Sequence, residues 1–211
     1  MVNKMKVVRP VLIVLLLAVN IYLIGFAPNS IKEPSKELIP ANVTVINATD
    51  QTESMEHPDF KKAEYTLVLP EGTNIALEKK VKASSFADVY TPRKTTDGIA
   101  VGVSYWEGKP EYPNYLTVDL EKKEMFQAIR LALSPMAVWG KRTQTIAVNI
   151  SDDGENFTPL AEAKQYTFDP DLGNEAQLFF DNVQARYVQL VFTENTGSGG
   201  GQLAEFEVYQ K

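Results

Sequence analysis

The chain contains no cysteine among its 211 residues. Disulfide bonds, thiolate metal sites and a cysteine nucleophile are therefore excluded. Histidine is almost as scarce, because His57 is the only one, and it stands beside Pro58 without a serine or aspartate partner in the context of a folded domain. A hydrolytic triad is therefore not expected.

An excess of positive charge is also missing. The chain has 21 Lys and Arg against 27 Asp and Glu, a net charge of -6 and a pI near 5.0. Such a surface does not attract nucleic acid or anionic lipid, so neither is expected to be the main partner. The length is enough for one core domain with extensions, or for two small domains.

Long apolar runs are missing after residue 27, but one lies before it. Residues 1–9 carry only basic charges, and residues 11–27 are almost all apolar. This length lies between a signal-peptide core, about 7–15 residues, and a membrane span, about 17–25. Residues 1–27 are thus predicted to be either an uncleaved membrane anchor or a cleaved signal, although Pro28 disfavours cleavage after Ala27. Either way the rest of the chain lies outside the cell, as a single-pass cell-membrane protein or a secreted one.

Residues 28–71 contain several prolines and mixed charges, which is typical of an extracytoplasmic linker. Within them only 41–46 and 65–69 have strand-like composition. The second of these segments is a candidate edge strand for the domain that follows. Otherwise we expect a solvated spacer.

From residue 74 onward short apolar runs recur between turn residues. Leu116, Val118 and Leu120 alternate with polar neighbours, and a similar alternation covers residues 145–151. A period of two indicates half-buried antiparallel strands, whereas no helical period appears after residue 27. Many short strands in such a length predict an all-β fold, a β-sandwich or jelly roll, over residues 72–211.

Catalytic and phosphate-binding motifs are not evident in this segment. Asp152 and Asp153 belong to an Asp-Asp-Gly turn, so their carboxylates point apart rather than across a cleft. The glycines Gly199 to Gly201 precede a strand and not a helix, which removes the helix-terminus mechanism of phosphate binding. The sequence predicts that the protein is not an enzyme.

Several short sequence segments occur in the order found in one known family. They are Asn74-Ile75-Ala76-Leu77 with Val81-x-Ala83-Ser84-Ser85, Thr96-Asp97-Gly98, Tyr105-Trp106-Glu107 with Tyr115-Leu116-Thr117-Val118-Asp119-Leu120, Arg142-Thr143-Gln144-Thr145, Ser151-Asp152-Asp153-Gly154-x-x-Phe157, Ala185-Arg186-Tyr187-Val188, and Gln202-Leu203-Ala204-Glu205-Phe206-Glu207-Val208-Tyr209. Residues 74–211 thus resemble discoidin domains, the coagulation factor V/VIII C-type family, and bacterial carbohydrate-binding modules in particular. The resemblance implies a galactose-binding-like jelly roll that binds its ligand through loops at one end.

The resemblance also implies a structural calcium ion. Relatives often hold it with the aspartate that corresponds to Asp97 and the glutamate that corresponds to Glu205, and Ser104 lies close by in the sequence. Oxygen ligands of this kind suit calcium. The alternative is that Asp97 belongs to a plain turn and Glu205 is an exposed strand residue. Residues 99–103 depart from the family because they are apolar where many relatives are polar.

A sugar site needs an aromatic platform for C–H faces and a few polar groups for hydroxyls. Trp139 and Arg142, in a loop between two predicted strands, form the best candidate pair. The alternative has Trp139 capping the core and Arg142 in a surface ion pair, and Trp106 is expected in the core. Further rim candidates are Glu107, Tyr112, Asn114, Asn195 and Gln202, although local turn hydrogen bonds are an equal alternative for the last two.

These residues favour a non-catalytic, membrane-tethered extracellular module that binds a cell-wall or external polysaccharide. Two other functions stay open. One is a protein-binding adhesion module, and the other is an accessory subunit of an envelope complex. The sequence does not identify the sugar.

Overall fold

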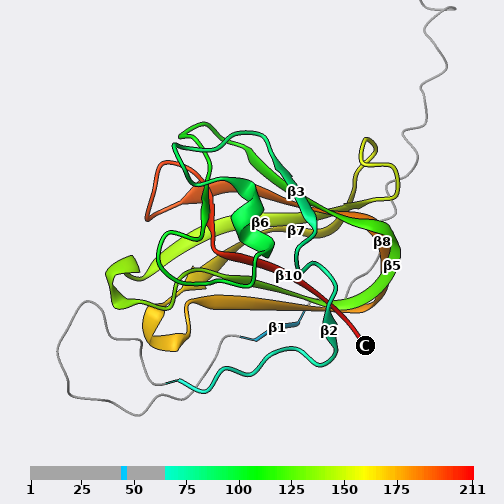
Figure 1. Cartoon of the computed structure of the whole chain (residues 1–211), viewed down its shortest axis with the longest axis horizontal. Coiled ribbons are helices and arrows are strands. Elements are labelled where there is room, and N and C mark those ends of the chain that lie inside the picture. Colours follow the sequence, from blue (N-terminus) through cyan, green and yellow to red (C-terminus); the bar gives the residue numbers. More distant parts are fainter. Residues whose placement is uncertain (1–43, 47–64) are drawn as a thin grey trace, which may run out of the picture. The chain divides into compact units, whose positions relative to one another are not determined.

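The computed structural model describes the backbone of residues 44–46 and the whole of residues 65–211 (Figure 1). This part of the chain consists of strands joined by loops and three short 3₁₀ turns, as the sequence predicts. The strands are β1 (Thr44–Ile46), β2 (Thr73–Asn74), β3 (Lys80–Ala83), β4 (Trp106–Glu107), β5 (Asn114–Ala132), β6 (Arg142–Ser151), β7 (Thr158–Phe168), β8 (Glu175–Asn195), β9 (Gln202–Leu203) and β10 (Glu205–Gln210). The turns are η1 (Pro92–Thr96), η2 (Ala137–Trp139) and η3 (Pro170–Leu172).

The long strands β5 and β8 each contribute to two layers of a sandwich. The first half of β5 pairs with β3 and with the second half of β8, which also pairs with β6, followed by β7. The second half of β5 pairs with β10 and with the first half of β8, and β2 extends this layer beyond β10. The register shifts between Asp119 and Glu124, where both ribbons curve at the right of Figure 1. Because bulges bend strands, β5 and β8 pass from one layer to the other at this point.

The core lies between the layers and comes from the alternation that the sequence shows. Leu116 and Val118 of β5 and Ile146 and Val148 of β6 are fully buried. Trp106 is also fully buried, and its Nε1 donates a hydrogen bond to the carbonyl oxygen of Ser85 at 2.9 Å. Its predicted core position is confirmed, because an indole buried with its N–H paired has no polar group left for a ligand.

The chain closes at β10, which lies between β2 and β5. Tyr209 stands opposite Asn74, so the end of the chain is beside the start of the domain. The side chains of β10 are almost all buried on both faces. Phe206 and Val208 lie on one face, and Glu205 and Glu207 lie on the other.

Parts of the predicted linker are attached to the domain. β1 pairs with β8, with Val45 opposite Leu178. Residues 65–70 form no strand, so the expected edge strand at 65–69 is wrong, but Gln177 Nε2 donates to the carbonyl oxygen of Val68 at 2.7 Å. The predicted anchor or signal at 1–27 lies outside the described residues. Within the described part of the chain, no helix has the length and apolar character to cross a membrane.

Candidate functional site

A row of three aromatic rings lies at the end of the sandwich where β6 begins. Tyr90 and Tyr105 are stacked with centroids 4.2 Å apart, and Tyr105 meets the edge of Trp139 at 4.7 Å. Trp139 belongs to η2, is half-buried and packs against the core cluster. The row therefore presents aromatic surface that the core holds in place.

Arg142, the first residue of β6, lies over this row. Its guanidinium carbon is 5.0 Å from the centre of the Trp139 ring, within the range of a cation–π contact. Nη1 donates to Gln202 Oε1 at 2.6 Å, and Nε donates to the carbonyl oxygen of Gly140 at 3.4 Å. Burial lowers the pKa of Arg142, although nearby Glu107 and Tyr105 act in the opposite direction.

Gln202 connects Arg142 to a network of polar groups. The two-stranded pairing of β4 with β9 places Glu107 opposite Gln202. Gln202 Nε2 donates to Glu107 Oε2 at 3.0 Å, and Gln202 Oε1 also accepts from Asn195 Nδ2 at 3.3 Å. The other Glu107 oxygen accepts from Ser198 Oγ at 2.6 Å. Four side chains from three segments are thereby fixed relative to Arg142.

The glycine-rich loop before β9 fits tightly against this network. A Cβ atom on Gly197 would lie 2.7 Å from Cδ and Nε of Arg142, and one on Gly200 would lie 2.0 Å from the carbonyl oxygen of Gly108. No side chain can occupy these positions without moving its neighbours. The glycines therefore allow the loop to pack beneath Arg142.

The structure brings together five of the six predicted sugar-binding residues, namely Trp139, Arg142, Glu107, Asn195 and Gln202. Asn195 is buried and its amide is committed within the loop, donating to Gly200 and accepting from Gly197 N, both at 2.8 Å. Tyr112 is 40% exposed on the loop before β5, and burial, followed by Glu194 and Glu107, raises its pKa. Their roles in binding stay predictions.

Sequence reasoning did not assign Tyr90 and Tyr105 to the site. The alternation of Tyr105-Trp106-Glu107 contained a signal for Tyr105, because a buried Trp106 turns its two neighbours to the opposite side. Tyr90 gave no such signal, since only the fold brings its loop to Tyr105. Asn114, another predicted rim residue, holds two loops together. Its Oδ1 accepts from Gly201 N, and its Nδ2 donates to the carbonyl oxygen of Glu111.

The predicted metal ligands form a second cluster. Asp97 Oδ2 accepts from Ser104 Oγ at 2.5 Å, and Asp97 Oδ1 accepts from Ile99 N at 2.9 Å. Glu205 is 2% exposed, so its alternative placement as an exposed strand residue is wrong. Burial, together with Glu207 and Asp97, raises the pKa of Glu205 to about 8.

The Glu205 carboxyl group is chemically suited to bind a cation. Neither of its oxygens has a hydrogen-bond partner of normal geometry among the described residues, although Ile99 and Asp97 lie near enough to influence its pKa. Such a buried carboxylate is costly unless a proton or a cation accompanies it. Asp97 and Ser104 supply further oxygen ligands of the type that calcium prefers. Among the described residues no group of three or more acidic or histidine side chains is arranged for a metal, so backbone carbonyls would complete the set.

The acidic turn at residues 152–154 is as the sequence predicts. Asp152 pairs with Lys123 at 2.7 Å. Asp153 accepts from Asn156 Nδ2 at 2.7 Å and from two backbone N–H groups, and these bonds lower its pKa. The two carboxylates are thus engaged separately.

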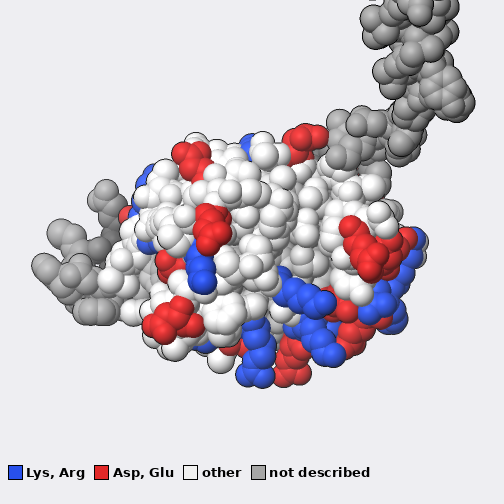
Figure 2. Space-filling model, turned by 90° about the horizontal axis from the view of Figure 1, so that it is seen from above, with Lys and Arg blue, Asp and Glu red and all other residues white. Residues whose placement is uncertain are grey.

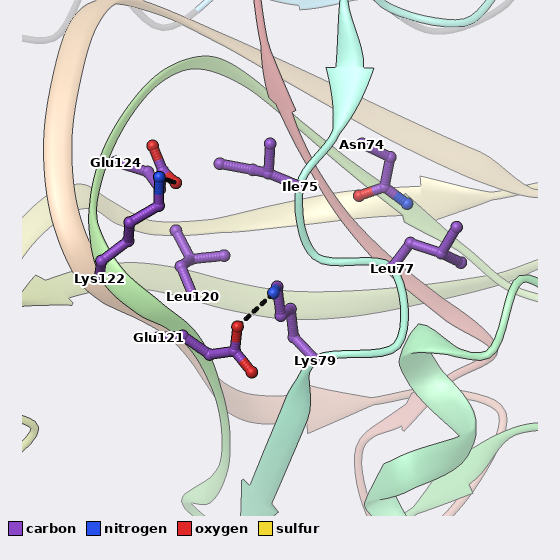
Figure 3. A pocket seen from close by; sticks show the side chains of 8 residues that line it. All are labelled: Asn74, Ile75, Leu77, Lys79, Leu120, Glu121, Lys122 and Glu124. Carbon is purple, nitrogen blue, oxygen red and sulfur yellow. Dashed lines mark hydrogen bonds and ion pairs between the residues drawn. The ribbon is translucent and has the colours of Figure 1, made fainter.

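A hollow of about 480 Å³ lies at the opposite end of the strands from the aromatic row. Figure 3 shows Ile75 and Leu120 within it and the Lys79–Glu121 ion pair at its rim. The hollow offers an apolar floor and compensated charges, with no aromatic ring among its lining residues.

On the face drawn in Figure 2, Lys and Arg side chains lie among Asp and Glu side chains, without a large area of one sign.

Residues 80–206 match the F5/8 type C domain family. The chain belongs to this family. The resemblance found in the sequence is thereby confirmed, and the sandwich described above is that of an F5/8 type C domain. A comparison with curated protein sequences found no match.

Solved structures with the same fold include several carbohydrate-binding modules. A fucose binding module from Streptococcus pneumoniae is 20% identical with a TM-score of 0.51, and covers 69% of this chain and 100% of its own. The module CpGH89CBM32-5 from Clostridium perfringens, in complex with GalNAc-β-1,3-galactose, is 23% identical with a TM-score of 0.53. The match covers 63% of this chain and 96% of that module.

A third structure is the CBM32 of AlyQ in complex with 4,5-unsaturated mannuronic acid, which is 19% identical with a TM-score of 0.51. The match covers 63% of this chain and 95% of that one. This F5/8 type C chain also matches SpGH29 at 21% identity and a TM-score of 0.53, but it spans 28% of the length of that protein. At these identities the comparisons establish the shared fold.

Proposed function

We propose that this F5/8 type C protein is a non-catalytic module that binds a cell-wall or external glycan at the end of the sandwich formed by Tyr105, Trp139, Arg142 and Glu107. The observation that carries the proposal is the aromatic row beside a fixed polar network. Similar folds are seen in modules described as binding fucose or solved with GalNAc-β-1,3-galactose, which supports a sugar ligand.

The arrangement suits a sugar in two ways. Trp139 and Tyr105 offer aromatic surface to the C–H face of a pyranose ring. Arg142 offers donors to its oxygen atoms, and Glu107 is held by Ser198 and Gln202 at the edge of the same site. Because the network is in place before a ligand arrives, little ordering entropy is lost on binding.

A glycan array with the full-length protein tests the proposal, followed by titration calorimetry on the glycans that bind. Trp139→Ala removes the ring and should weaken binding about tenfold or more. Val138→Ala is the matched control, because Val138 is 60% exposed on the same turn and is not part of the row. Equal binding by wild type and Trp139→Ala would contradict the proposed site, and no binding to any glycan would contradict the proposed function.

We also propose that Asp97, Ser104 and Glu205 hold a structural calcium ion. The orphaned Glu205 carboxyl group supports this proposal. The ion would neutralise Glu205 and fix the loop that follows η1, without taking part in a reaction. Calcium should raise the melting temperature of the wild type and not that of Glu205→Gln, which keeps the shape and loses the charge. Equal melting temperatures with calcium and with a chelator would overturn the proposal.

We propose a location outside the cell membrane for the domain. Residues 1–27 would serve as an anchor or a cleaved signal, and the part of 28–71 that is not attached to the sandwich would serve as a spacer. Protease treatment of intact cells should remove the domain from an anchored protein, and it should appear in the medium if the signal is cleaved. Protection from protease without secretion would contradict this location.

A protein partner is the second candidate function, and one observation favours it. Ile99, Val101 and Val103, in the loop after Asp97, are 50%, 51% and 67% exposed. Aliphatic side chains that gather on one exposed loop are typical of protein contact surfaces. Capture of an envelope protein that persists in excess free glycan and is lost in Val101→Ser with Val103→Ser would support this function.

A further inference from the structure

Arg142 is held differently from the other arginines that are not fully exposed in the described part of the chain. Arg130 pairs with Glu175 and Glu207, and Arg186 pairs with Asp119. None of the ion pairs formed by the described residues includes Arg142. Its hydrogen bonds go to an amide oxygen and to a backbone carbonyl. A half-buried cation thus stands without an anion in contact.

Glu107 is the acidic group whose charge acts on Arg142, and its oxygens are engaged elsewhere. Ser198 and Gln202 donate to its two oxygens. Gln202 stands between the two charged groups, because it accepts from Arg142 and donates to Glu107. The glutamate therefore orients the amide that orients the guanidinium, and Nη2 of Arg142 makes no hydrogen bond within the described residues.

The physical state of Arg142 favours an incoming anion. Burial lowers its pKa because water is removed from around the charge. A guanidinium presents two parallel N–H groups that match a carboxylate or a sulfate, and such charge-assisted pairs are stronger than bonds to neutral hydroxyls. An anion bound at Nη2 would replace the stabilisation that the guanidinium charge loses with its water. A neutral hydroxyl would replace only part of it.

A second cation lies at the other end of the aromatic row. Lys94 Nζ is 5.6 Å from the centre of the Tyr90 ring and donates to the carbonyl oxygen of Val103 at 2.7 Å. It too forms no ion pair with a described residue. The row Tyr90, Tyr105 and Trp139 is thus flanked on both sides by unpaired positive charge, in a protein whose net charge is -6.

We infer that the ligand of this site is an acidic glycan, whose carboxylate or sulfate group binds Arg142 while its sugar ring packs on Trp139 and Tyr105. The inference rests on the proposed glycan-binding function and specifies the class of glycan. Because the whole protein is acidic, the preference comes from the direct contact with Arg142 and not from long-range attraction.

The experiment compares acidic glycans with their own neutral forms, using the full-length protein and titration calorimetry. Polygalacturonate and alginate are measured beside the same polymers after chemical reduction of the carboxyl groups. A sulfated galactan is measured beside its desulfated form. The acidic member of at least one pair should bind about tenfold tighter or more, and the arms separate carboxylate from sulfate.

Variants locate the effect. Arg142→Gln should abolish the preference for the acidic member, and Arg142→Lys should retain part of it, since the charge stays and the fork is lost. Lys141→Gln is the matched control, because it removes the same charge one residue away, at a side chain paired with Asp169 at 2.9 Å. Melting curves of each variant establish that the fold is kept, and Arg142→Lys decides the matter if Arg142→Gln is unfolded.

The outcomes separate the inference from the proposed function. Equal or tighter binding of the neutral forms, or a preference that survives in Arg142→Gln, overturns the inference and leaves the proposed function intact. Binding of neither form of any pair, with no neutral glycan bound on the array, overturns both.

Discussion

The second layer of the sandwich and its loop end each hold an arginine, and the two have opposite surroundings. Arg130 on β5 is 5% exposed and pairs with Glu175 at 2.5 Å and Glu207 at 2.7 Å. The carboxylates raise its pKa in spite of its burial. Arg142 is less buried, contacts no carboxylate in the described part of the chain, and its pKa is lowered by burial.

The difference shows how one side chain serves two purposes. The charge of Arg130 is compensated by its own fold, because Nε and Nη1 donate to the carboxylates of Glu175 and Glu207, and Glu207 also accepts from the hydroxyl of Tyr209 at 2.8 Å. The charge of Arg142 is positioned by neutral groups, so it can contact something that is not part of the chain. Function is therefore better indicated by what a buried charge lacks than by its residue type.

The largest effect is expected where the buried pairing is broken. Arg130→Met leaves Glu175 and Glu207 buried without their cation, and it should lower the free energy of unfolding by about 3–5 kcal/mol. Urea denaturation of the purified protein measures this value. A loss below about 1 kcal/mol would mean that water reaches the two carboxylates and that Arg130 is less structural than its contacts indicate.

Glu205 extends the contrast, since it lies on the same face of β10 as Glu207 but forms no ion pair with a described residue. Its pKa is about 8 when folded against an ordinary value of 4.5, so the folded state binds the proton more tightly. The tighter binding of this proton stabilises the folded protein. In calcium-free buffer the stabilisation should be complete below the unfolded pKa and should disappear as the pH rises through about 8.

The measurement is the difference in unfolding free energy between wild type and Glu205→Gln across this pH range. The difference should change by at most about 1.4 kcal/mol per pH unit. A difference that does not vary with pH would show that Glu205 has the same pKa in the folded protein as in the unfolded chain.

Arg142→Met should cost less stability than Arg130→Met. It removes the hydrogen bonds to Gln202 and Gly140 and the contact with Trp139, for a loss of about 1–2 kcal/mol. Urea denaturation measures the stability, and titration with the acidic glycan measures the binding, which should weaken to the level of the neutral form. The comparison fails if Arg142→Met destabilises the protein as much as Arg130→Met does, because Arg142 would then be a structural residue.

The smallest effect is expected at Arg186, which is paired but partly exposed. Its Nε and Nη2 donate to the two oxygens of Asp119 at 2.8 and 2.9 Å, and the arginine side chain is 39% exposed. Water competes for such a pair, so Arg186→Gln should lower the unfolding free energy by less than about 1 kcal/mol. A loss comparable to that of Arg130→Met would show that burial does not set the order of these effects.

Much of the fold could be predicted from the chain, because burial of one face of a strand leaves a period of two in the sequence. The positions of Leu116, Val118 and Ile146 are examples. The continuity of β5 through residues 114–132 could not be predicted, because the polar residues at the bulge after Asp119 resemble a turn between two separate strands.

The site was predicted in part. Trp139 and Arg142 could be chosen by residue type and by their place between two strands. Tyr90 could not, because its contact with Tyr105 joins loops that the strand pattern does not relate. The burial of Glu205 was equally hidden, because β10 is buried on both faces, whereas alternation indicates only the face of Phe206 and Val208.

The class of fold, the family and the absence of cysteine chemistry follow from residue composition, periodicity and motif order, and can be read from the chain. Which charges are compensated depends on the three-dimensional arrangement of the strands. Arg130 and Arg142 are the same residue type at strand positions, and what separates them is which side chains the register of β8, β9 and β10 places within reach. Pairing of that kind depends on distances between segments far apart in the chain, and a linear sequence does not contain those distances.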